Sequence, residues 1–297
     1  MQDTSTNHRF AWLRNPSRKA LLIVSGLLFI VVVLVNVALS FSFLKFVFLT
    51  HGTHVETVEN GVPTWYALSF GTATKVDGAP GFNTAPMTVL EAVAYGEEGA
   101  HAVLARVPGV EGIAIGILHP NNTFENVLSD GTNKADLAVR PDGMALYAAM
   151  VDGESRLMSL DLTNTEEVPS ELGRGRSPRV FTDGFFVAVT DEGIARIDPV
   201  SKDVAVLIPS ADADLLNGTI SPDGLTVAIS NTSGKTLLYT IQRTSPGDVA
   251  LSSTVKFPAL SPLTFIRTNF IAEKSASSIS VYEHAPVFRK VGSLRIK

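Results

Sequence analysis

The segment SPDGLTVAIS, residues 221–230, places a Pro-Asp-Gly turn directly before an apolar run. Two earlier segments follow the same pattern, RPDGMALYAAM from Arg140 and FTDGFFVAVT from Phe181. The aspartates of the three turns lie about 40 residues apart: Asp142, Asp183 and Asp223. After each turn come an apolar run and two further turn-and-run pairs, which indicates four strands per period when the run before the turn is counted. Four strands in about 40 residues is typical of a β-propeller blade.

The flanking sequence repeats the same alternation of runs and turns without the Asp-Gly pair. Residues 88–128 and 263–291 each contain such runs, and residues 64–76 remain as a partial sixth unit or as a strand that closes the ring. We therefore predict an all-β fold, a propeller of five or six four-stranded blades over residues 88–297. Residues 50–87 would supply a linker and the partial blade or closing strand. We expect closure because an open ring exposes an unpaired sheet edge.

The segments RPDG…LYAA and SPDG…VAIS resemble the Pro-Asp-Gly repeats of TolB-type and related WD40-like propellers. The resemblance covers residues 140–230 well and residues 88–297 more loosely. It implies that each turn joins the innermost strand of a blade to the next strand, the Asp accepting backbone hydrogen bonds and the Gly adopting positive φ. We expect structural roles for six turn residues: Asp142, Gly143, Asp183, Gly184, Asp223 and Gly224. The resemblance implies little about function, because such propellers serve as binding platforms, protease-associated domains and enzymes.

Near the N-terminus, residues 20–49 read ALLIVSGLLFIVVVLVNVALSFSFLKFVFL and are apolar almost throughout. A membrane span needs about 20 such residues, whereas the apolar part of a cleaved signal peptide has about 7 to 15. We predict a transmembrane signal-anchor helix. Only Lys45 follows closely, whereas four basic residues precede the run: Arg9, Arg14, Arg18 and Lys19. The positive-inside rule then places residues 1–19 in the cytoplasm and the propeller outside, in a periplasm or at the cell surface.

Composition and motifs argue against several function classes. The net charge is −5 with interspersed signs, so no basic face suggests nucleic acid as a partner. The chain has no cysteine, which excludes disulfides and cysteine-ligated metals. Neither a Gly-x-Ser-x-Gly elbow nor a phosphate-binding glycine loop occurs. His51 and His54 are three residues apart without a third ligand. We predict no catalytic residues, no metal site and no cofactor.

One basic segment interrupts this acidic chain: GRGRSPR, residues 173–179, contains Arg174, Arg176 and Arg179. We expect a loop between two blades, opening on the face that carries ligands in propellers, beside the turns at 152–155, 191–193 and 231–235. These arginines are the candidate partner-binding residues, because guanidinium groups bind acidic partners. The alternative is a solvated turn that aids solubility.

The sequence thus favours a non-catalytic role. We expect a membrane-anchored, exported propeller that acts as a protein-interaction scaffold, an accessory subunit of an envelope or membrane assembly. Its partners would be other membrane or envelope proteins and the lipid bilayer through residues 20–49. One alternative is an anchored hydrolase or lyase acting on a polymer, and another is a sensor that binds a ligand in the propeller channel. Two or more inward-facing carboxylates of raised pKa in one polar pocket would favour the enzyme.

Overall fold

The structure is a computed structural model, and the chain divides into two compact units, Met1–Leu49 and Thr50–Lys297, which are described separately. The residues that it describes are 16–40, 46, 50–82, 84–96, 98–164, 166, 168–180, 184–209, 219–222, 225–230, 235–245, 248–258, 263–267, 270–283 and 289–297.

The first unit contains helix α1, Pro16–Ser40. Its large apolar side chains between Leu21 and Val35 that are described are all exposed, and because they occupy consecutive positions they cover every side of the helix. Within the described residues, no helix combines the length and the apolar character needed to cross a membrane.

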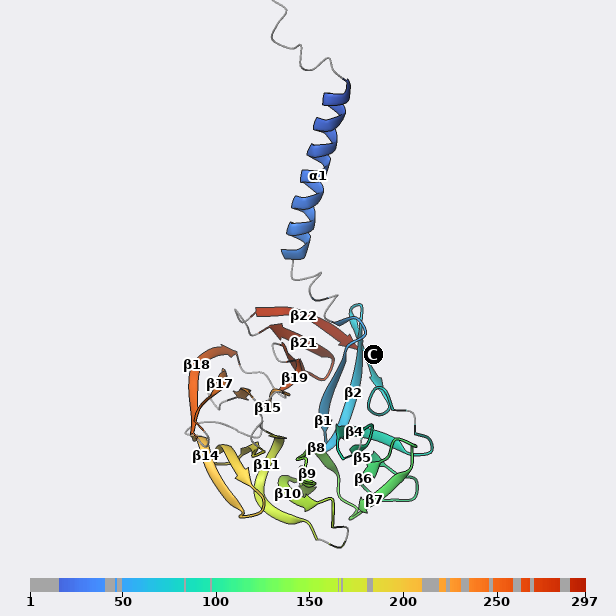
Figure 1. The fold of residues 1–297 in the computed structure, drawn as a ribbon, viewed down its shortest axis with the longest axis vertical. Coiled ribbons are helices and arrows are strands. Elements are labelled where there is room, and N and C mark those ends of the chain that lie inside the picture. The colour runs from blue at the N-terminus through green and yellow to red at the C-terminus, as the bar shows by residue number, and fades with distance from the viewer. Residues whose placement is uncertain are drawn as a thin grey trace, which may run out of the picture. The chain divides into compact units, whose positions relative to one another are not determined.

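The second unit is all-β, as the sequence predicts, and its sheets surround a common centre (Figure 1). The first four-stranded blade consists of β4 (Thr88–Ala94), β5 (His101–Arg106), β6 (Ala114–Leu118) and β7 (Phe124–Leu128). The second has β8 (Lys134–Val139), β9 (Met144–Val151), β10 (Glu154–Asp161) and the first half of β11 (Ser170–Val180). The third has the second half of β11, β12 (Phe186–Thr190), β13 (Gly193–Asp198) and β14 (Asp203–Pro209).

Two more blades complete the repeat pattern among the described strands. The fourth contains β15 (Thr219–Ile220), β16 (Thr226–Ser230), β17 (Lys235–Ser245) and β18 (Asp248–Pro258). The fifth contains β19 (Leu263–Arg267), β20 (Phe270–Lys274), β21 (Ser278–Glu283) and β22 (Arg289–Ile296). Within each blade, neighbouring strands are antiparallel, as expected for strands joined by short turns.

The N-terminal strands extend the last blade into a seven-stranded sheet. They form an antiparallel meander of β1 (His54–Glu59), β2 (Val62–Ser69) and β3 (Thr72–Val76). Strand β3 pairs in parallel with β22, with Thr72 opposite Arg295 and Ala73 opposite Ile296. This pairing covers an edge that would otherwise be open.

The β1–β2 hairpin ends beside the second blade. The Asn133 side-chain amide donates a hydrogen bond to the Asn60 carbonyl at 3.3 Å. At Gly61, φ is +74° and an added Cβ would lie 1.8 Å from Met150 Cγ, so glycine permits both the turn and the close approach. Because Asn133 immediately precedes β8, the end of β1 meets the beginning of β8. Strand β1 therefore lies beside the second blade at this end.

The segment with the three arginines, Arg174, Arg176 and Arg179, is not a loop, so that prediction was wrong. Strand β11 runs unbroken from Ser170 to Val180 and changes sheets midway, pairing first with β10 and then with β12. Gly173, which suggested a turn in the sequence, lies within this strand. Its φ of +118° is a conformation that favours glycine and is typical of a bend in a strand.

The core lies between the sheets. One large cluster joins the first two blades and includes Leu104, Ile115, Tyr147 and Leu160, each at most 1% exposed. Burying such a side chain contributes about 1.5–3 kcal/mol. The fully buried Lys134 is tolerated beside this core because its ammonium group donates to the Ile113 carbonyl at 2.9 Å and to the Asp130 carboxylate.

Candidate functional site

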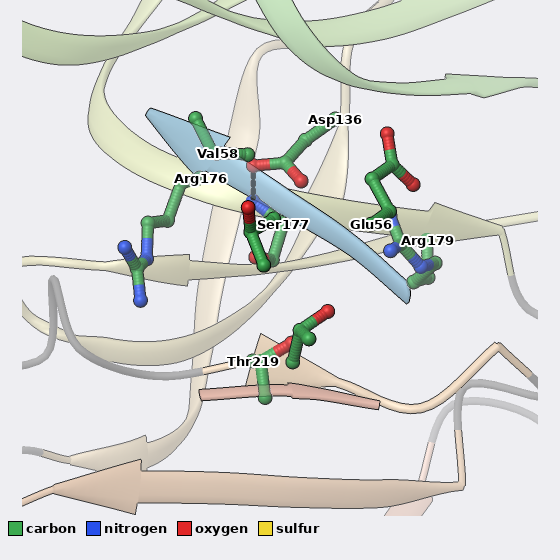
Figure 2. A pocket seen from close by; sticks show the side chains of 9 residues that line it. Glu56, Val58, Asp136, Arg176, Ser177, Arg179 and Thr219 are labelled. Atoms are coloured by element: carbon green, nitrogen blue, oxygen red, sulfur yellow. Dashed lines mark hydrogen bonds between the residues drawn. The ribbon is translucent and has the colours of Figure 1, made fainter. Parts of the chain in front are cut away.

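A small polar pocket lies where the innermost strands meet. Its volume is about 50 Å³, enough for roughly three or four water molecules. Residues on five strands, β1, β8, β11, β15 and β19, line it (Figure 2). These residues are Glu56, Thr57, Val58, Asp136, Arg176, Ser177, Arg179, Thr219 and Thr264.

Two irregular strands shape the pocket. Asp136 in β8 has φ +56° and Ser177 in β11 has φ +52°, and the strand register shifts at both places. Such bulges bend a strand and redirect its side chains. The Ser177 N–H donates to Asp136 Oδ2 at 3.1 Å, the bond drawn in Figure 2. A positive φ at a residue other than glycine costs of order 1–3 kcal/mol, so the surrounding strands and this bond must hold the arrangement.

Behind the pocket wall, Glu91 of β4 is only 8% exposed. Its Oε1 accepts the Leu137 N–H at 2.9 Å, while Oε2 has no hydrogen-bond partner among the described residues. Burial and, to a lesser extent, the negative charge of Asp136 raise the pKa of Glu91, Arg179 opposes both, and the net result is a pKa of about 8. Glu91 is therefore mainly protonated at neutral pH.

The pKa of Glu56 in β1 is raised by the same effects. Burial raises its pKa well above the ordinary value, the charges of Glu91 and Asp136 add to this, and Arg179 opposes them. When Glu56 and Glu91 are both protonated, the described side chains of the site that still carry charge are Asp136, Arg176 and Arg179, a net charge of about +1. The site then offers hydrogen-bond donors as well as acceptors.

A second cavity, of about 220 Å³, shares Val58, Asp136 and Arg176 with the pocket. Its other walls come from the Asn60–Gly61 turn and from the second blade. The second-blade residues are Ala135, Ala148, Ala149, Met150 and Ser155, most of them apolar. The two cavities thus combine a charged end with a more apolar one.

The predicted partner-binding arginines do not act as one patch. Arg176 and Arg179 line the pocket and point to opposite sides of it (Figure 2). Arg174 belongs to a different surface, where its Nη2 lies 3.3 Å from Glu154 Oε1. Arg156 pairs with the same Glu154 and with Glu171, each at 2.8 Å. Exposed pairs of this kind contribute about 0–1 kcal/mol each.

Only some of the six turn residues predicted from the sequence lie among the residues that the structure describes. The Met144 N–H donates to Asp142 Oδ1 at 3.2 Å, and φ is +95° at Gly143 and +84° at Gly184. Asp183, Asp223 and Gly224 lie outside the described residues, as does most of the predicted turn at 231–235.

Metal binding finds no support in this part of the chain. Among the described residues, no group of three histidine, aspartate or glutamate side chains is placed to hold a metal ion. The carboxylates of the central site instead share their surroundings with Arg179, which would repel a cation.

The sequence prediction missed Glu56, Glu91 and Asp136. Each is an ionisable residue inside a strand that also carries apolar or β-branched residues: HVETVE, TVLEAVA and KADLAV. The last two runs are also the first strand of their blade, which the resemblance to propellers identified as the innermost. Collecting the ionisable residues of every first run would therefore have located Glu91 and Asp136, but not Glu56 of β1.

No family model and no curated protein sequence matches the chain. Among solved structures, TolB from Acinetobacter baumannii is similar over 83% of this chain, with 17% identity and a TM-score of 0.46; the chain spans 64% of that protein. The Myceliophteria thermophila Cps50 (Swd1) β-propeller domain matches 82% of this chain and 84% of that one, with 9% identity and a TM-score of 0.48. A streptogramin B lyase matches 81% of this chain and 83% of its own, with 12% identity and a TM-score of 0.44. The propeller assignment rests on the strand order above.

Proposed function

We propose that this chain is a membrane-anchored, extracytoplasmic β-propeller that acts as a non-catalytic protein-interaction module, an accessory subunit of a membrane or envelope assembly. The observation that carries the proposal is the size of the central pocket, about 50 Å³. Pockets that enclose drug-sized molecules measure about 300–1,000 Å³, so a polymer chain does not fit here. Even together with the adjoining cavity of about 220 Å³, the centre stays below this range, so this propeller is suited to binding macromolecules with its outer surface.

The anchor is the second part of the proposal. Helix α1 exposes apolar side chains on every side, and the apolar sequence continues to residue 49. Covering each large apolar side chain by lipid contributes about 1.5–3 kcal/mol. The basic residues before the helix favour a cytoplasmic N-terminus, which leaves the propeller in a periplasm or at the cell surface.

Membrane fractionation tests the anchor. The full-length chain should stay in the membrane pellet after alkaline carbonate washing, and protease added from outside should digest residues 50–297. Recovery in the carbonate supernatant, or protection of the propeller until the membrane is opened, would contradict this part of the proposal.

Affinity purification tests the interaction role. The tagged full-length chain, cross-linked in membranes and purified in mild detergent, should recover a membrane or envelope protein in stoichiometric amount. Arg174→Glu, on the exposed ion-pair surface with Glu154, should lower this recovery several-fold, whereas Lys202→Glu in the β13–β14 turn is the matched control. A wild-type protein purified without any partner would refute the scaffold.

A ligand-binding sensor is the second candidate, and a specific observation favours it. Glu56 and Glu91 are two carboxyl groups of raised pKa at one polar centre, the feature expected of the enzyme alternative. The pocket is too small for a polymer, and Glu91 lies behind its wall. These carboxyl groups therefore suit the binding of a small molecule better than the cleavage of a large one.

A further inference from the structure

Hydrogen-bond donors dominate the lining of the central pocket. Arg176 and Arg179 contribute guanidinium groups from one strand, β11. Side-chain hydroxyl groups come from four other lining residues: Thr57, Ser177, Thr219 and Thr264. Guanidinium and hydroxyl groups around a small volume are the groups that bind carboxylate or phosphate oxygens.

The charges facing the pocket can be assigned strand by strand. Strand β1 contributes Glu56, β4 contributes Glu91 from behind the wall, and β8 contributes Asp136. Strand β11 contributes Arg176 and Arg179, while the described lining residues of β15 and β19 are threonines without charge. The net charge is about +1 when both glutamates are protonated and about −1 when both are ionised, so protonation reverses its sign.

We propose that this pocket binds a small organic anion between Arg176 and Arg179, which line it from opposite sides and supply the positive charge. The adjoining cavity of about 220 Å³ receives the uncharged part of the molecule. Its apolar wall, formed by Ala148, Ala149 and Met150 among others, favours a short hydrocarbon tail over a bare inorganic ion.

The unpartnered Oε2 of Glu91 supports this assignment. A buried carboxyl oxygen without a hydrogen bond costs about 1–3 kcal/mol. A carboxyl group that changes its charge beside the pocket alters the binding of a ligand there, which accounts for keeping Glu91 at this cost in stability. Because burial raises its pKa to about 8, Glu91 ionises as the solution becomes alkaline and then repels an anion.

Calorimetric titration of the full-length chain in detergent, with butyrate, acetate and inorganic phosphate as probes, tests the proposal. At about pH 6 butyrate should bind, and more tightly than acetate, since each methylene group buried on the apolar wall adds roughly fourfold. If inorganic phosphate bound as tightly as butyrate or more tightly, the proposal that the ligand carries a hydrocarbon tail would be refuted. At about pH 9.5 the affinity for butyrate should fall at least tenfold.

Variants distinguish a loss of ligand binding from a loss of folding. Arg179→Gln and Arg176→Gln should each weaken butyrate binding at least tenfold at about pH 6. Arg174→Gln, on the same strand but outside the pocket, is the matched control and should leave it unchanged. Glu91→Gln should lose most of the pH dependence of butyrate binding. Thermal melting checks that each variant is folded.

Several results would overturn the inference. These are the absence of binding by every probe at about pH 6, undiminished binding by the folded Arg176→Gln/Arg179→Gln variant, and an affinity that does not change with pH. The inference goes beyond the scaffold role and does not depend on it, because ligand titration uses the purified chain alone and partner recovery uses membranes.

Discussion

Glu59 Oε1 lies 3.0 Å from Lys274 Nζ, so an ion pair connects β1 with β20 of the last blade. The same carboxylate accepts the Tyr66 hydroxyl at 2.7 Å and pairs with Lys75 at 3.2 Å. Burial raises the pKa of Glu59, but the bonds from Tyr66, Lys274 and Lys75 outweigh it and lower the pKa to about 2. One carboxylate thus joins the N-terminal strands to the C-terminal blade.

Replacing this carboxylate should weaken the closure of the ring. Because the pKa is lowered in the folded state, Glu59 stabilises the fold above its unfolded value and loses this contribution as pH falls towards about 2. We expect Glu59→Gln to lower the free energy of unfolding by about 1 kcal/mol at neutral pH, since Lys75 is largely solvated and screening reduces its share. Urea denaturation at neutral pH and at about pH 3 measures the difference, which should shrink at the lower pH.

Asp77→Asn is the control for this experiment. Asp77 is 83% exposed and lies 3.8 Å from Arg106, so its removal should change the free energy of unfolding by less than about 0.5 kcal/mol. An equal effect of the two substitutions would show that Glu59 acts as an ordinary surface charge.

Glu91 should make the fold less stable as the pH rises from about 4.5 to about 8. Its pKa is raised to about 8, so between its ordinary value and about 8 the folded state holds a proton that the unfolded chain has lost. The free energy of unfolding should therefore fall by about 1 kcal/mol per pH unit across that window. Glu91→Gln resembles the protonated acid and can still accept the Leu137 N–H, so it should be as stable as the wild type at about pH 5 and more stable above about pH 8. Urea denaturation of the wild type and of Glu91→Gln at several pH values measures how the free energy of unfolding of each protein changes with pH.

The exposed Glu111 provides the comparison, and Glu111→Gln should reproduce the wild-type slope. If Glu91→Gln also kept that slope, Glu91 would be ionised in the folded protein, and its proposed control of the pocket would fail with it.

The repeat architecture could be predicted from the sequence because it depends on local signals. The Asp-Gly turns and the short runs rich in Val, Ile and Ala encode strand length and spacing, and each blade is contiguous in the chain except where β11 is shared. The parallel pairing of β3 with β22 could not be predicted. It joins segments about 220 residues apart, and nothing in either run specifies its partner.

The central site was only partly predictable for a related reason. GRGRSPR has the composition of a turn, and its local preference for one was overridden by pairing with β10 and then with β12. Arg176 and Arg179 were found as candidates because they interrupt an acidic chain. Glu56 and Glu91 were missed because a glutamate in a strand suggests a solvent-facing position, and only the ring brings the inner strands together.

Gly175, at the point where β11 leaves one sheet for the next, should not tolerate a side chain. A Cβ there would lie 2.5 Å from the Val189 carbonyl oxygen and 2.6 Å from Leu157 Cδ1, and backbone cannot yield as a flexible side chain does. Gly175→Ala should cost about 1–3 kcal/mol through overpacking. A fall in melting temperature of about 2–4 °C per kcal/mol would report it.

Gly173→Ala offers a comparison on the same strand. Its Cβ would meet nothing within 4 Å, so only the positive φ of +118° would be strained. If Gly175→Ala destabilised the protein no more than Gly173→Ala does, close packing would not be the reason for glycine at position 175.

The final residues should be needed for ring closure. The N–H groups of Arg295 and Lys297 donate to the carbonyls of Gly71 and Ala73 at 3.0 Å, and that of Ile296 donates to Ser277 at 2.9 Å. Removing residues 295–297 deletes at least these three backbone bonds, worth about 0.5–1.5 kcal/mol each, and uncovers the edge of β3. The melting temperature should fall by about 5–10 °C, and light scattering should detect association through the open edge.

Lys297→Ala keeps every one of these backbone bonds and should melt as the wild type does. If the truncated chain also melted unchanged and stayed monomeric, the Glu59–Lys274 pair and the packing of β1 against β19 would be sufficient to close the ring. Combining the truncation with Glu59→Gln separates the two contacts that close the ring, the backbone bonds of residues 295–297 and the Glu59–Lys274 ion pair. Because both connect the N-terminal meander to the last blade, the double variant should lose more stability than the sum of the single changes if either contact can replace the other.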